Sequence, residues 1–177
     1  MLLALVASEP AYACRMYAAT VLEDVKYADV VLVGRISNYR IVRDLEQRQR
    51  MLRLPNLSAE MRKMYEDPTK SLLWDHARFD VQVDQVLFGK VPRRLSVTWD
   101  NSTFGEPGQM PAGPFLIALR DPNSKTPPLR GPSATILPNR EPGLLTVLQA
   151  PCASPFLFET TSDDARAIRQ ILKAKPQ

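Results

Sequence analysis

The chain has 177 residues, of which 45% are hydrophobic and 24% charged, with a formal net charge of +4. These values are typical of one soluble globular domain that is long enough to form a hydrophobic core. No apolar run approaches the ~20 residues that a membrane-spanning helix needs. The single histidine, His76, excludes a histidine-rich metal site, and two cysteines cannot build a structural zinc site without other strong ligands.

The N-terminus carries the pattern of a signal-peptidase site. An apolar stretch at residues 2–7 precedes Ala11-Tyr12-Ala13-Cys14, which has small residues three and one before Cys14. We therefore expect residues 1–13 to be a signal-peptide remnant and residues 14–177 to be one exported domain, periplasmic or secreted. The apolar stretch is short and no basic residue precedes it, so an uncleaved, buried N-terminal strand or helix is the alternative.

Export would place the two cysteines in an oxidising compartment. Cys14 and Cys152 then have one intramolecular pairing open to them. In the chain-entropy model, closing so long a loop stabilises the fold by about 4–5 kcal/mol. We therefore expect a disulfide between Cys14 and Cys152.

The first structured elements are a short helix and a strand. Thr20 and Glu23 fit a capping box, which predicts a helix through about Tyr27. Residues 29–41 are rich in β-branched side chains and predict a strand buried on much of both faces. Gly34 predicts a bulge or sharp bend within it, as small barrels need.

Residues 43–75 predict a helical insertion between two strands. Its first part is helix-forming and basic, and a second short helix begins at Ser58. The candidates for an anion-binding or partner-binding face are Arg43, Arg48, Arg50 and Arg53. The alternative is a solvated helix face, on which these arginines are interleaved with Asp44 and Glu46.

The clearest strand signal follows the insertion. Apolar and polar residues alternate over 78–84 and again over 94–100, which places each apolar set on one face. Gly89-Lys90 supplies a turn between them, so the two segments predict an antiparallel hairpin. Residues 115–119 predict a continuous apolar strand, and residues 144–148 predict the last strand.

The C-terminal third combines a long loop and a helix. Residues 121–143 are rich in proline and predict an irregular loop. A helix is expected over 161–174, with acidic residues at its start, lysines at its end and an apolar stripe that docks on the rest of the fold. Five strands with few helices and no βαβ rhythm predict a mainly β fold with added helices. We expect a five-stranded OB-like barrel with a helical insertion and a C-terminal helix.

Several short motifs also occur in a characteristic order. They are Cys14, Ala28-Asp29, Gly34-Arg35-Ile36, Val81-Gln82-Val83, Phe88-Gly89, Phe115-Leu116-Ile117 and Cys152. In this order they resemble the bacterial exported members of the netrin-like group, which share the OB-fold of the tissue inhibitors of metalloproteinases. The resemblance covers most of residues 14–158 outside the insertion, and it implies an exported barrel that begins with a cysteine.

The resemblance also implies a role for Cys14. In the inhibitors, the amine and carbonyl of a mature N-terminal cysteine chelate the catalytic zinc of a metalloproteinase. This chain departs from their Cys-x-Cys start at Met16, and Arg15 is large and charged where a small residue normally follows the first cysteine. Inhibition therefore ranks behind a simpler binding role.

The leading hypothesis is an exported, non-enzymatic OB-fold protein that binds an unknown protein or surface ligand, with a contact surface on the insertion and the proline-rich loop. One alternative is a metalloproteinase-inhibitor-like protein that uses Cys14. Another is a nucleic-acid-binding OB domain, which the basic balance favours. The aromatic residues disfavour a nucleic-acid partner, because bases stack on exposed rings and four rings fall at expected core positions: Phe79, Phe88, Trp99 and Phe115.

An enzyme is disfavoured on similar grounds. Asp75 with His76, or Asp80 with Asp84, are pairs with acid–base chemistry, but surface or packing roles suit these positions better. The chain has no glycine-rich phosphate loop, nucleophile elbow or paired metal motif. We therefore predict no catalytic residues, no cofactor and no metal, and the sequence names neither the partner nor the oligomeric state.

Overall fold

The computed structural model describes residues 18–70, 72, 74–100, 107–126, 129 and 141–174. Within these ranges most strands follow one another directly, with few helices between them. In chain order they are the 3-10 helix η1 (Leu22–Tyr27), β1 (Val30–Val42), α1 (Leu45–Leu52), α2 (Ala59–Glu66), β2 (His76–Phe88), β3 (Arg94–Asp100), β4 (Phe115–Arg120), β5 (Leu145–Val147), β6 (Leu157–Glu159) and α3 (Asp163–Ala174). Among the described residues, no helix has the length and apolar character needed to cross a bilayer.

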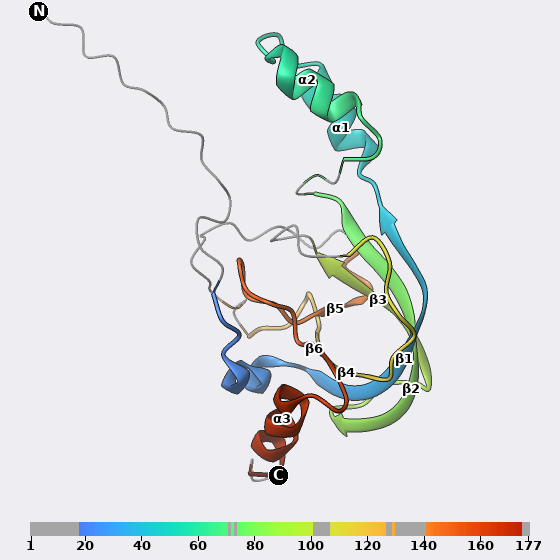
Figure 1. The fold of residues 1–177 in the computed structure, drawn as a ribbon, viewed down its shortest axis with the longest axis vertical. Helices are drawn as coiled ribbons and strands as arrows, with labels where there is room; N and C mark the ends of the chain where they lie inside the picture. Colours follow the sequence, from blue (N-terminus) through green and yellow to red (C-terminus); the bar gives the residue numbers. More distant parts are fainter. Residues whose placement is uncertain are drawn as a thin grey trace, which may run out of the picture.

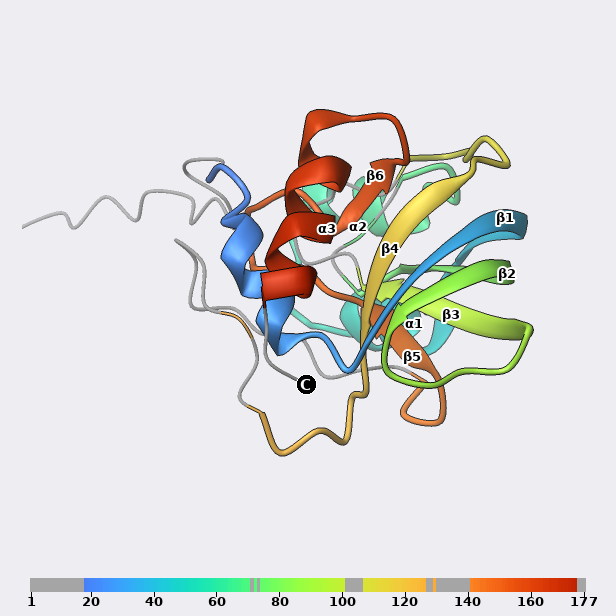
Figure 2. The same cartoon turned by 90° about the horizontal axis from the view of Figure 1, so that it is seen from below.

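Five strands form a closed barrel. They are hydrogen-bonded in the order β1-β2-β3-β5-β4, and β1 also pairs with β4, which completes the ring (Figures 1 and 2). The pairing of β3 with β5 is parallel, and the other pairings within the ring are antiparallel. β6 adds to β4 as an extra antiparallel strand. The predicted fold is therefore confirmed: an OB-like barrel with a helical insertion and a C-terminal helix.

The long strand β1 bends at Gly34. A Cβ atom at this position would lie 2.7 Å from the carbonyl oxygen of Gln82 on β2, closer than real Cβ atoms approach backbone. The pairing of β1 with β2 also shifts register between Val33 and Gly34. Glycine lets the two strands approach and curve together, so the bend predicted at this position is confirmed.

Apolar side chains fill the barrel and cover part of its outside. The interior holds the residues predicted from the alternation, among them Phe79, Val81, Val97 and Trp99. A second apolar layer lies between the outside of the barrel and the helices η1 and α3, which run side by side (Figure 2). Ile168 of α3 is fully buried in this layer, so the helix docks through its apolar stripe as expected.

Two local predictions are wrong. The Thr20 hydroxyl does not cap η1, because it donates to the carbonyl oxygen of Ser154 at 3.3 Å. Phe88 does not lie in the core and is 40% exposed. A register shift in the pairing of β1 with β2 makes Leu87 an extra residue, and Leu87 packs against the outer apolar layer while Phe88 turns outward.

The insertion forms an arm, defined here as residues 43–70. Its helices α1 and α2 contact each other and lie beyond the end of the barrel, at the opposite end of the molecule from α3 (Figure 1). The Ser58 hydroxyl accepts from the amide of Met61 and caps α2, as predicted. Of the loop expected at 121–143, residues 127–128 and 130–140 lie outside the described part of the chain.

Candidate functional site

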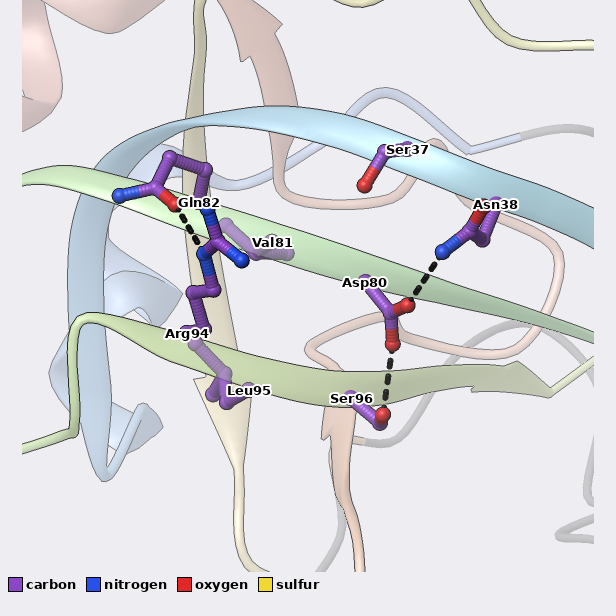
Figure 3. A pocket seen from close by; sticks show the side chains of 8 residues that line it. All are labelled: Ser37, Asn38, Asp80, Val81, Gln82, Arg94, Leu95 and Ser96. Carbon is purple, nitrogen blue, oxygen red and sulfur yellow. Dashed lines mark hydrogen bonds between the residues drawn. The ribbon is translucent and has the colours of Figure 1, made fainter.

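A hollow of about 560 Å³ crosses the outer face of β1, β2 and β3 (Figure 3). Ligand pockets in proteins commonly have volumes of about 300–1,000 Å³. Six of its eight lining residues are polar. The lining residues are Ser37, Asn38, Asp80, Val81, Gln82, Arg94, Leu95 and Ser96.

Strand alternation places the polar residues together. On β2 and β3 the apolar side chains fill the barrel, so the residues between them face outward. Asp80 lies opposite Ser96, and Gln82 lies opposite Arg94. These cross-strand pairs form two polar rows, and Ser37 of β1 extends the first of them because it lies opposite Asp80.

Asn38 joins the hollow through an irregularity in β1. Its φ angle is +53°, in the left-handed region that asparagine tolerates better than most residues. The register of β1 with β2 shifts between Ser37 and Arg40, so Asn38 is not paired in the ladder. Its amide nitrogen donates to Oδ2 of Asp80 at 2.8 Å instead.

Asp80 is the anionic centre of the hollow. The Asn38 amide donates to Oδ2, and the Ser96 hydroxyl donates to Oδ1 at 2.6 Å. These two hydrogen bonds, with smaller help from the charges of Arg40 and Arg78, hold the pKa of Asp80 below its ordinary value. Asp80 is therefore ionised at neutral pH, and each carboxylate oxygen keeps a lone pair for a ligand.

Arg94 provides the positive end. Its Nε donates to Oε1 of Gln82 at 2.6 Å, which fixes the plane of the guanidinium group over β2 (Figure 3). Within the described part of the chain, its terminal nitrogens have no hydrogen-bond partner. Arg94 is exposed, so these donors face solvent and are accessible to a ligand.

Two of the four predicted arginines lie elsewhere, around Asp75. Nη1 of Arg43 lies 2.8 Å and Nη2 of Arg48 lies 2.7 Å from Oδ2 of Asp75. Asp75 is 1% exposed and Arg48 is 5% exposed. Arg48 also donates to the carbonyl oxygens of Asp67 and Lys70. The guanidinium groups of Arg43 and Arg48 are thus engaged in attaching the arm to the start of β2.

The carboxylate of Asp75 is fully engaged. Its burial alone would raise its pKa. Hydrogen bonds from the amide of Leu72, the side chain of Arg43 and the amide of Asp44, together with the charge of Arg48, outweigh burial and lower the pKa below its ordinary value. Asp75, Arg43 and Arg48 form what we call the Asp75 cluster.

The other two predicted arginines remain on the surface of the arm. Arg50 pairs with Glu46 at 2.8 Å, and both side chains are largely exposed. Arg53 is exposed at the C-terminal end of α1. The four arginines therefore do not form one continuous face, and none of them lines the hollow.

The acid–base pairs considered from the sequence do not form. His76 is 6% exposed, and its Nε2 lies 3.0 Å from Oε1 of Glu141, whose other oxygen accepts from Arg78 at 2.8 Å. Asp84 pairs with Arg35 at 3.4 Å. In the described ranges, no three histidine, cysteine or acidic side chains are grouped so that they could hold a metal ion.

Cys14 lies outside the described residues, and its predicted partner Cys152 is 1% exposed. Ala18 donates its amide to the carbonyl oxygen of Cys152 at 2.8 Å, and it forms a parallel bridge with Ala153. The chain four residues beyond Cys14 therefore lies directly against Cys152.

Of the residues that line the hollow, only Asp80 was considered from the sequence as a possible site residue. Their signal was present as the polar half of the alternation on 78–84 and 94–100. The apolar positions of this alternation locate the core of the barrel. Its polar positions mark the outer face of the same strands, where the hollow lies. No family model, curated protein or solved structure matches this chain, so its function is argued from the geometry of the site.

Proposed function

We propose that this protein is an exported, non-enzymatic binding module that holds a polar ligand in the hollow on β1, β2 and β3. The observation that carries the proposal is the convergence of six polar side chains from three adjacent strands on one hollow of about 560 Å³. OB-fold barrels bind ligands on the face of strands 2 and 3, between the loops that follow strands 1 and 4. In this chain the same face is polar, and these two loops are long.

The character of the hollow favours recognition over catalysis. Asp80 is held ionised by Asn38 and Ser96, whereas a general acid or base at neutral pH needs a pKa near 7. Asp84 is four residues further along the strand, about 13 Å away at ~3.3 Å per residue. Asp80 thus suits the acceptance of hydrogen bonds from a ligand.

The hollow also favours a polar ligand over nucleic acid. Proteins that bind single strands stack bases on exposed aromatic side chains. None of the eight residues that line the hollow is aromatic, and the carboxylate of Asp80 would repel a phosphate backbone. The metalloproteinase-inhibitor-like alternative rests on Cys14 and stays a prediction from the resemblance.

A thermal-shift screen tests the proposed function. The panel contains neutral and acidic oligosaccharides, amino acids, short peptides and a single-stranded oligonucleotide. A ligand present at 100 times its dissociation constant stabilises the folded protein by about 2.7 kcal/mol. We expect at least one polar class to raise the unfolding temperature of the wild type but not of Asp80→Ala. A ligand that stabilises both proteins equally would contradict binding in the hollow.

We further propose export to the periplasm or cell exterior and a disulfide between Cys14 and Cys152. The contact of Ala18 with Cys152 supports this pairing, since four residues are enough to return Cys14 to its partner. An intact mass of the protein from its native host, before and after reduction with thiol alkylation, tests both points. We expect a chain beginning at Cys14 whose two thiols react only after reduction. A chain that begins at Met1 with both thiols reactive would contradict both.

A further inference from the structure

Resting on the proposed function, we infer that the ligand is an acidic sugar unit of an oligosaccharide. Its anionic group lies on the guanidinium of Arg94, and its hydroxyls lie on Asp80 and the neutral polar groups beside it. The two charged side chains stand on neighbouring strands, and Arg94 is two residues before the Ser96 that holds Asp80. Two residues along a strand span about 7 Å, which separates the two ends by roughly one sugar ring.

Arg94 is built to take an anionic group. Because Gln82 accepts from Nε, the guanidinium keeps one orientation and presents its two terminal nitrogens. A planar pair of N–H donors matches two oxygens of one carboxylate, sulfate or phosphate. The described residues place no carboxylate on these nitrogens, so a ligand anion would be their first partner.

Asp80 determines which way the ligand lies. Its carboxylate only accepts hydrogen bonds, so the ligand must place donors there and keep its own negative charge at the Arg94 end. A sugar hydroxyl meets this need, because it can donate to Asp80 and accept from a neighbour at the same time. The hydroxyl of Ser37, which lies opposite Asp80 on β1, is such a neighbour.

The acceptors of Asp80 and the size of the hollow favour a sugar over an amino acid. The two carboxylate oxygens of Asp80 already accept from Asn38 and Ser96, so their remaining lone pairs point in separate directions. Several hydroxyls match this spread of acceptors better than one ammonium group does. The volume of about 560 Å³ and the extent of the hollow over three strands also leave room for a neighbouring sugar.

The test uses two ligands that differ only in whether their carboxyl groups carry a charge. Isothermal titration calorimetry compares an oligogalacturonide with its methyl ester, which keeps every hydroxyl and loses the carboxylate charge. We expect the acid to bind wild-type protein at least tenfold more tightly than the ester. Arg94→Gln should remove this preference, and Asp80→Asn should weaken both ligands. Arg53→Gln, an exposed arginine on the arm, is the matched control and should leave both affinities unchanged.

Further ligands identify which anionic group binds and whether a free amino acid binds in place of a sugar. Sulfated and phosphorylated oligosaccharides, tested beside the oligogalacturonide, identify which anion binds, and preference for any of them over its neutral form supports the inference. Equal binding of acid and ester, or an acid preference that survives Arg94→Gln, would overturn it. Binding of a free amino acid instead would also overturn it but leave the proposed function standing. If no ligand of any class binds the hollow, both proposals fail.

Discussion

At the scale of single residues, the carboxylate of Asp75 joins the arm to the barrel. It accepts from Arg43 and Arg48 in a buried site, although Arg48 precedes it by 27 residues. The sequence placed these arginines on a helix but gave no sign that a distant aspartate would bind them. Their basic character therefore suggested a binding face, whereas two of the four are part of the fold.

Asp75→Asn removes the charge from the Asp75 cluster and leaves two arginines without their carboxylate. Removal of one partner from a buried ion pair costs about 3–5 kcal/mol. We expect a loss of this size in the free energy of unfolding, measured by urea titration. Glu46→Gln, which breaks the exposed pair with Arg50, is the control and should cost at most about 0.5 kcal/mol. Equal losses in the two variants would contradict this role of Asp75.

Asn38→Ala tests the electrostatics of the hollow. The Asn38 amide is the largest cause of the lowered pKa of Asp80, so its removal should raise that pKa towards the ordinary value of 3.8. In the wild type the lowered pKa stabilises the fold above pH 3.8, and this contribution is lost as the pH falls through the folded-state pKa. Carboxyl carbon chemical shifts measured against pH report the change. Ser37 lines the same hollow but does not hydrogen-bond to Asp80. The control variant Ser37→Ala should therefore leave the pKa of Asp80 unchanged.

At the scale of elements, the strands could be predicted and their irregularities only in part. The alternation of apolar and polar residues predicts β2 and β3, because one face of each strand packs inside the barrel. Gly34 predicts the bend in β1. The short strand β6 was not predicted, because its three residues follow a loop and form a strand only through their pairing with β4. The outward turn of Phe88 depends on a register shift between two strands, which no local pattern encodes.

Gly34→Ala tests the close approach of β1 and β2. The added Cβ would lie 2.7 Å from the backbone oxygen of Gln82, and the strand cannot yield as a flexible side chain would. Overpacking of this kind costs about 1–3 kcal/mol. We expect a loss in that range in the free energy of unfolding. Gly143→Ala, where nothing lies within 4 Å of the new atom, should be close to neutral.

At the scale of the whole molecule, the barrel was predictable and the site was not. Fold class follows from the number and type of segments, each of which has a local signal. The hollow is instead formed where three strands meet, from residues between 37 and 96 that look like ordinary solvated positions along the chain. Strand register brings all of them except Asn38 together, and register is set by the packing of the opposite, apolar face.

The proposed disulfide would act on the whole chain. If Cys14 and Cys152 are bonded, reduction should lower the free energy of unfolding by about 4–5 kcal/mol in the chain-entropy model, because the loop includes most residues. Urea titrations with and without a reducing agent measure this difference. A Cys14→Ser variant should behave like the reduced protein. Identical unfolding midpoints under the two conditions would show that no such bond contributes.

Ligand location is the most direct measurement of the central claim. Amide chemical shifts of the ¹⁵N-labelled protein, recorded as an oligogalacturonide is added, show which residues the ligand contacts. We expect saturable shifts centred on Asn38, Asp80 and Arg94 across three strands, with the arm and α3 unaffected. Saturable shifts confined to the arm or to other loops would contradict a binding site in the hollow.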